Sequence, residues 1–196
     1  NTEATGGAAG GVAIDAVAAV TTLNQTTEAT IGTGSPLNAA SVEVRSTNSG
    51  DHTATATGDT KSDSVGIGAS AAVITSKALA SATIKRDVSS AGDITIAASA
   101  DRSYEAVATA SSKGANPLGE GEESSSKSTS SKTLKDTADK QKGTSGGKKV
   151  DIAAAVGVSV IDDDVEAGIT GGAAESKRNI TTGGKLSITA DTISDF

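Results

Sequence analysis

Apolar and polar residues alternate with a period of two along most of this chain, and one alternating run occurs three times. The run is clearest at 65–73, and altered copies of it lie at 12–20 and 150–158. In each copy an early isoleucine is followed 17 residues later by a second one, which gives the pairs Ile14 and Ile31, Ile67 and Ile84, and Ile152 and Ile169. Self-similarity of this kind indicates stacked structural units, none of which can bury its apolar face alone.

Each repeat holds more than one stretch with strand character. Segments at 41–45, 93–97 and 185–189 share one alternating pattern, and segments at 52–57 and 104–109 share another. Turns are expected between them, where Gly, Pro, Asn and Asp gather, at 32–36, 48–51, 91–93, 171–172 and 183–184. Four strands in a repeat of 53 residues predict about two coils of roughly 26 residues each, with three strands per coil as the alternative.

The pattern therefore predicts an all-β protein. A parallel β-solenoid is favoured over a β-sandwich, because equivalent residues then stack from coil to coil. In such a solenoid Ile14, Ile67 and Ile152 would form one apolar ladder that points into a narrow, dry interior. The chain divides into repeats 1 and 2 at 1–112, a polar and flexible insert at 113–149, and repeat 3 of the same solenoid at 150–196.

If the isoleucines point inward, the alternate positions of the same runs point outward, and these positions are unusually small. A solvent-facing strand usually carries Lys, Glu or Thr, whereas small side chains allow another surface to approach closely. We expect this face to pack against another layer of the same molecule or a sister filament, and the alternative is an exposed face that is merely small. The packing-face residues are Gly66, Gly68, Ser70, Ala72, Ala153, Ala155 and Gly157.

Composition and charge narrow the possible structures and partners of the protein further. Aromatic residues make up 1% of the chain, and Met and Cys are absent, so the core must be thin and built from Val, Ile and Ala. The net charge is −7, and the insert is basic while the remainder is acidic, which disfavours nucleic acid as a partner. No apolar run is long enough to span a membrane. The chain begins in mid-pattern without an initiator Met, and we expect it to be a piece of a longer polypeptide.

The repeats resemble those of very large bacterial surface proteins. The resemblance is carried by VAIDAVAAV and TEATIG in the first copy, SVGIGASAAVI and ASATI in the second, and VDIAAAVGVSVIDDDVEAGI in the third. It is a resemblance to adhesins of the filamentous-haemagglutinin and autotransporter-passenger kind. It implies a right-handed parallel β-solenoid, export to the cell surface, and a role as a stalk, an adhesin or a matrix component of a biofilm. It carries over no functional residue.

The densest acidic cluster, at 162–166, is the weak candidate for a functional site, since its oxygen ligands could hold Ca²⁺ in a turn. Its spacing does not fit a calcium-binding loop, and a solvated acidic turn is the alternative. His52 is the only histidine, which leaves no histidine-based triad within this chain, and it is expected at the surface. Tyr104 is expected to pack or to cover a strand end. The acidic candidates are Asp162, Asp163, Asp164 and Glu166.

Two further readings compete with a structural role. The basic and acidic run at 85–87 could belong to a carbohydrate-active β-helix enzyme, although the aromatic platforms that bind sugars are missing. The row Thr53, Thr55 and Thr57 is typical of ice- or surface-binding solenoids, but its counterpart at 105–109 does not sustain it.

The sequence therefore predicts a non-enzymatic structural or adhesive segment of an extracellular protein on the bacterial cell surface. Expected partners are neighbouring coils of the same long chain or sister filaments, with cell-surface or polysaccharide ligands as further candidates, and no nucleic acid. No cofactor is expected beyond the calcium ion that the acidic cluster could hold.

Overall fold

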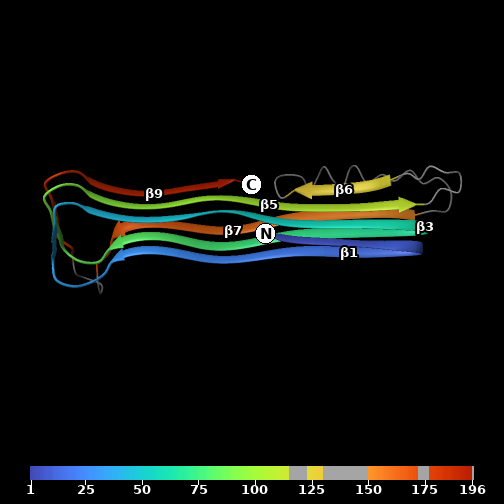
Figure 1. Cartoon of the computed structure of the whole chain (residues 1–196), viewed down its shortest axis with the longest axis horizontal. Coiled ribbons are helices and arrows are strands. Elements are labelled where there is room, and N and C mark those ends of the chain that lie inside the picture. Colours follow the sequence, from blue (N-terminus) through green and yellow to red (C-terminus); the bar gives the residue numbers. More distant parts are fainter. Residues whose placement is uncertain (115–122, 130–149, 172–176, 196) are drawn as a thin grey trace.

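The computed structural model of the chain describes residues 1–114, 123–129, 150–171 and 177–195. These residues form a long, narrow rod of β-strands (Figure 1). The long strands are β1 (Thr2–Ile31), β3 (Val42–Ile84), β5 (Ile94–Gly114), β7 (Val150–Ile169) and β9 (Leu186–Asp195). Shorter ones are β2 (Leu37–Ala39), β4 (Val88–Ser90), β6 (Glu123–Thr129) and β8 (Ile180–Thr182). The all-β prediction is confirmed.

The chain winds lengthwise along the rod and reverses at both ends. β3 pairs with β5 as far as Ser62 and with β7 from Val65 onward, so its two halves run in opposite directions on either side of a tight turn (Figure 1). The matching turn in β1 has Gly10 at a φ of 151° and a shift of register before Val12. At this position glycine avoids the steric cost that other residues have at positive φ.

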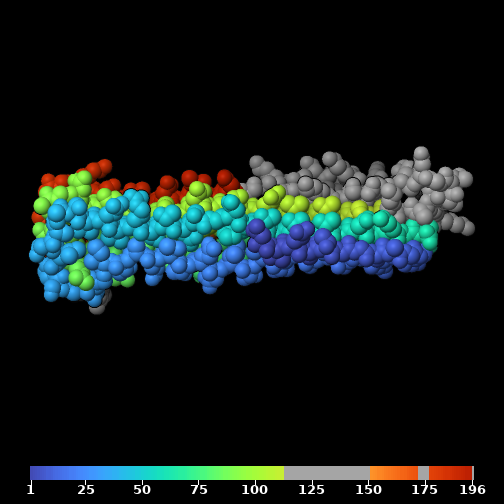
Figure 2. Space-filling view, in the orientation of Figure 1, coloured from blue at the N-terminus to red at the C-terminus, as the bar shows by residue number. Residues whose placement is uncertain are grey.

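Two layers result. The outgoing layer consists of the runs at 2–10, 42–62, 94–114 and 186–195, and the returning layer consists of the runs at 12–31, 65–84 and 150–169. Pairing between successive turns is parallel throughout these runs, which confirms a parallel solenoid. Figure 2 shows the successive rungs as bands along the length of the rod, in sequence order across its width.

One coil spans a whole repeat, so the prediction of two coils per repeat was wrong. Val42 pairs with Ile94, and Ile14 pairs with Ile67, which in turn pairs with Ile152. The predicted turn at 48–51 is the source of the error, since these residues lie inside β3. A run of Asn, Ser and Gly continues the strand here because the neighbouring rungs supply the hydrogen bonds of its backbone.

The isoleucine ladder is real, but it faces outward. Ile14 is 66% exposed and Ile152 is 47% exposed, so the expected inward direction was wrong. The small residues at the alternate positions, predicted to face outward, line the interior instead. Of the packing-face residues, Ser70, Ala72, Ala153 and Ala155 are at most 6% exposed, Gly66 and Gly68 are buried, and Gly157 is half-buried.

Over part of its length the interior is only one small side chain thick, because the two layers lie very close together there. Ser70 on the returning layer donates a hydrogen bond of 2.7 Å to the Thr109 carbonyl on the outgoing layer. Ser46 donates one of 2.8 Å across the same gap to the Thr27 carbonyl. A Cβ placed on Gly68 would lie 2.6 Å from the Ser111 carbonyl oxygen. Small residues are therefore required here by the spacing of the layers.

The core consists of two clusters along the rod. Towards the end that carries the short strands, the interior is filled by branched residues: Val42, Val44, Ile84, Val88, Ile94 and Ile96. Further along, alanines fill most of it, together with Ile74 and Tyr104. The short strands β2, β4 and β8 form a separate three-stranded sheet at one end of the rod, opposite the tight turns.

The repeat-3 strands β7 and β9 continue the same two layers. Within the predicted insert at 113–149, the structure describes 113–114 and β6, which pairs antiparallel with β5 from Val107 to Lys113. The sequence did not predict this strand. Residues 115–122 and 130–149 of the insert lie outside the described residues, and the expectation of flexibility falls largely on them.

Candidate functional site

The acidic cluster of repeat 3 is divided between the two faces of β7. Strand geometry turns successive side chains to opposite faces, so Asp162, Asp164 and Glu166 are exposed while Asp163 points into the rod. Asp162 lies 3.9 Å from the exposed Lys77 ammonium group. No group of three or more His, Cys, Asp or Glu residues among those described is arranged to hold a metal ion. The calcium hypothesis for the cluster therefore has no geometric support.

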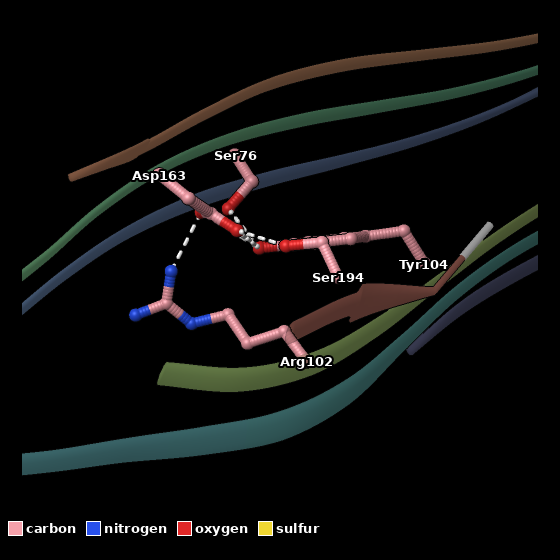
Figure 3. A network of polar contacts seen from close by, with 5 residues as sticks. All are labelled: Ser76, Arg102, Tyr104, Asp163 and Ser194. Atoms are coloured by element: carbon pink, nitrogen blue, oxygen red, sulfur yellow. Dashed lines mark hydrogen bonds and ion pairs between the residues drawn. The ribbon is translucent and has the colours of Figure 1, made fainter. Parts of the chain in front are cut away.

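Asp163 belongs to the one buried ion pair among the described residues, and it is the centre of a network of polar contacts (Figure 3). The Arg102 guanidinium Nη1 donates a hydrogen bond of 2.6 Å to Asp163 Oδ1, and the two side chains are 0% and 7% exposed. The Tyr104 hydroxyl donates to the same carboxylate at 3.0 Å, and the Ser194 hydroxyl donates to it at 3.1 Å. Ser76 shares a hydrogen bond of 3.1 Å with the Tyr104 hydroxyl.

The network joins both layers of the rod at mid-length. Arg102 and Tyr104 come from β5 and Ser194 from β9, all on the outgoing layer, whereas Ser76 and Asp163 come from β3 and β7 on the returning layer. Four runs that are distant in sequence are thus tied at one point of the interior. A buried ion pair fixes the register of its strands, because any slip would leave a charge without its partner.

His52 and Tyr104 lie side by side on adjacent rungs, with ring centroids 5.4 Å apart. His52 is 9% exposed, so its predicted surface position was wrong, whereas Tyr104 packs in the core, which is the first of the two alternatives expected for it. Burial lowers the pKa of His52, and the positive charge of Arg102 lowers it further. Burial also raises the pKa of the Tyr104 hydroxyl. Both rings are therefore held in their neutral forms.

Several polar atoms near this network are buried without a hydrogen-bond partner among the described residues. They include Nε and Nη2 of Arg102, Nε2 of His52 and Nδ2 of Asn48. Such atoms cost free energy when they are dry. The network therefore joins the two layers at some cost in free energy. We call the ion pair of Arg102 and Asp163 at its centre the clamp.

The basic and acidic run at 85–87 belongs to the chain reversal beside β4. Arg86 donates hydrogen bonds of 2.5 Å and 3.0 Å to the carbonyl oxygens of Gly32 and Thr33 on the preceding coil. Asp87 accepts one of 3.0 Å from the Asn179 amide on the following coil. These contacts connect three successive loops, and they give structural roles to Arg86 and Asp87, two of the three charged residues that suggested a carbohydrate-active site.

The threonine row at 53–57 lies on the outer surface of the outgoing layer. Thr57 pairs with Thr5 and Thr109, so threonine is repeated on three rungs at this one position. Thr53 pairs instead with Glu105, and Thr55 pairs with Glu3 and Val107. The row does not form a regular two-dimensional array of the kind that an ice-binding surface uses.

Comparison with protein families, with curated proteins and with solved structures finds no match to this chain. In the part of the chain that the structure describes, no helix is long and apolar enough to cross a membrane.

Arg102 is the residue that sequence reasoning missed, although a signal for it was present. It shares the period-two positions of Ala98, Ala100, Tyr104 and Ala106, while the polar residues of the same segment occupy the alternate positions. A lone arginine on a face that is otherwise alanine and tyrosine indicates a buried charge, and such a charge requires an acid from another strand.

Proposed function

We propose that this chain is a non-enzymatic structural segment of an extracellular bacterial surface protein or filament, in which it serves as part of a β-solenoid stalk. The proposal rests mainly on one observation, the unbroken parallel pairing of the rungs in the returning layer. Ile14, Ile67 and Ile152 lie on three successive rungs of the returning layer, and each rung is about 20 residues long there.

The edges of the returning layer support stacking of further rungs. The run at 12–31 and β7 both pair with the run at 65–84, and neither pairs with another described strand on its opposite edge. A long strand with an unpaired edge is a template for another strand. In a solenoid the stability of each rung comes largely from its neighbours. A stalk can therefore be lengthened by adding coils of the same kind, because each new coil is stabilised by the one it packs on.

The filled interior of the rod favours a structural role over the binding of a ligand inside it. Alanine side chains fill much of the space between the layers, and serine hydroxyls reach from one layer to the backbone of the other. The buried guanidinium of Arg102 is paired with Asp163 across the two layers. A filled rod of this kind is suited to the role of a stalk, which bears load and holds other parts of a protein away from the cell.

The test is to image the native polypeptide from which this chain comes and to record its fibre diffraction. We expect filaments that are many rungs long, with a spacing of about 4.8 Å along the direction in which rungs stack. Compact particles without that spacing would contradict the proposal. Surface location is tested separately by adding protease to intact cells, and a protein that is fully protected would contradict export.

A further inference from the structure

One half of the outer surface of the returning layer is apolar on every rung. In register, its large residues form an isoleucine ladder and a valine ladder: Ile14, Ile67 and Ile152, then Val20, Val73 and Val158. The ladders between them are mostly alanine, as in Ala16, Ala69 and Ala154. We call the outward residues of 12–22, 65–75 and 152–160 the apolar face.

The apolar face is open to solvent. Val20 and Val160 are each 56% exposed, and Ile14 is exposed to a greater extent still. Isolated apolar residues are common on protein surfaces, but a contiguous patch of this kind marks an interaction site. The outer surface of the outgoing layer gives the contrast, since it carries mainly Thr, Ser, Asp, Glu and Lys at the equivalent positions. The rod therefore has one polar side, whereas the opposite side is apolar over half of its length.

The size of the apolar face is set by strand geometry. Eleven residues along a strand span about 36 Å, and three rungs span about 14 Å, which gives roughly 500 Å² per copy. Two such faces in contact would bury roughly 1,000 Å² in total, which is the lower limit for a specific interface between proteins. The face is also flat and carries no charge, so it can pack on a second copy of itself as one sheet packs on another.

The other half of the same surface determines how two copies would face each other. Beyond the apolar face, the outward positions include the acids Asp162, Asp164 and Glu166 on β7 and Glu28 on β1. Two copies facing each other with their strands aligned would bring these acids together, and like charges at close range cost free energy. Reversing one copy end for end keeps the apolar faces in contact and places the two acidic halves at opposite ends.

We propose that the apolar face is a lateral association surface for a second copy of this chain, with the two copies related by a twofold axis that runs across the strands. The proposal goes beyond the stalk function, since it concerns contacts beside the rod rather than contacts along the stacking direction. It does not depend on where in the cell the protein is located.

The first test measures self-association of this chain by sedimentation over a range of concentrations. We expect a dimer that forms at roughly micromolar concentrations, given the modest area. The double variant Ile14→Lys with Ile152→Lys should weaken dimerisation at least about tenfold, because it would place desolvated charges in the contact. The matched control, Thr55→Lys with Thr95→Lys on the outer surface of the outgoing layer, should dimerise like the unaltered chain.

The second test addresses the orientation of the two copies. The chain has no cysteine, so single thiols can be placed at will. Ala71→Cys lies near the proposed axis and should be cross-linked to its counterpart by a short bis-maleimide. Asp164→Cys should not, because the two thiols would lie roughly 60 Å apart. Cross-linking at Asp164→Cys but not at Ala71→Cys would overturn the proposed orientation.

Two outcomes would overturn the association surface itself. One is a chain that is monomeric at every concentration, including one that instead floats with phosphatidylcholine vesicles and so uses the face for lipid. The other is a dimer that both lysine pairs leave unchanged while circular dichroism shows that the variants are folded. Failure of the stalk proposal would appear instead as the absence of rung stacking in the native material, so the two results are distinguishable.

Discussion

Replacing Asp163 by alanine should be among the most destabilising single changes in the described part of the chain. The substitution leaves the Arg102 guanidinium fully buried and unpaired, because its side chain has no exposed surface. Breaking a buried ion pair from one side costs about 3–5 kcal/mol. The Tyr104 and Ser194 hydroxyls also lose their acceptor, at about 1 kcal/mol each. We therefore expect a loss of about 5–7 kcal/mol in the free energy of unfolding.

Urea denaturation followed by far-ultraviolet circular dichroism measures this loss. Asp162→Ala is the matched control, because Asp162 is the adjacent residue, 72% exposed, and lies 3.9 Å from Lys77. An exposed pair of that kind contributes about 0–1 kcal/mol. Two neighbouring aspartates should thus differ by several kcal/mol for the sole reason that the strand turns one inward and the other outward.

The double variant Arg102→Leu with Asp163→Leu keeps the test informative if Asp163→Ala fails to fold. Replacing both members of a buried pair with apolar residues is often close to neutral, so the double variant should recover most of the lost stability. Equal effects of Asp162→Ala and Asp163→Ala would refute the burial of the pair. A double variant less stable than Asp163→Ala alone would refute the view that an unpaired charge causes the loss.

Two other changes test the interior. Gly68→Ala should cost about 1–3 kcal/mol by overpacking, because the added Cβ would press on the Ser111 backbone, whereas Gly168→Ala, which meets nothing within 4 Å, should be neutral or slightly stabilising in the same denaturation assay. Acidification should destabilise the protein through His52: its folded pKa lies below 6.5, the unfolded chain therefore binds more protons, and stability falls as the pH drops below about 6.5. Thermal unfolding at several pH values should show this loss, and His52→Gln should flatten that part of the profile; an unchanged profile would contradict the burial of the histidine.

The parallel solenoid could be predicted from the repeat because stacking imposes identical register on every copy. The recurring isoleucine at 14, 67 and 152 and the matched segments at 42–45, 94–97 and 186–189 pair directly in the structure. Each of these residues contacts its own equivalents on the adjacent rungs. The pairing therefore follows from the repeat in the sequence.

The direction of the faces was predicted wrongly because strand length was underestimated. Ile67 and Ile84 are 17 residues apart, an odd number, so in one uninterrupted strand they must point to opposite faces. Ile84 is fully buried, and Ile14, which pairs with Ile67, is mostly exposed. Assuming short strands allowed a turn between the two isoleucines and concealed this constraint. Lys77, at the same parity as Ile67, was a further sign that this parity faces solvent.

The clamp between Arg102 and Asp163 could be predicted only in part. The position of Arg102 among alanines marks it as inward, but its partner lies 61 residues away in sequence on the opposite layer. Pairing within a layer follows from the repeat, whereas contact between layers depends on where the chain reverses at each end of the rod. The sequence at 62–65 contains no Gly or Pro that would mark this reversal.

The strands lie along the length of the rod, and the hydrogen bonds between rungs lie across it (Figure 1). Tension applied along the strands loads every bond of a rung in shear at the same time, so the bonds must fail together. Tension applied from rung to rung loads the hydrogen bonds one after another, so that the strands unzip. The protein should thus resist pulling along one direction far better than along the other, and its mounting in a larger assembly would decide its strength.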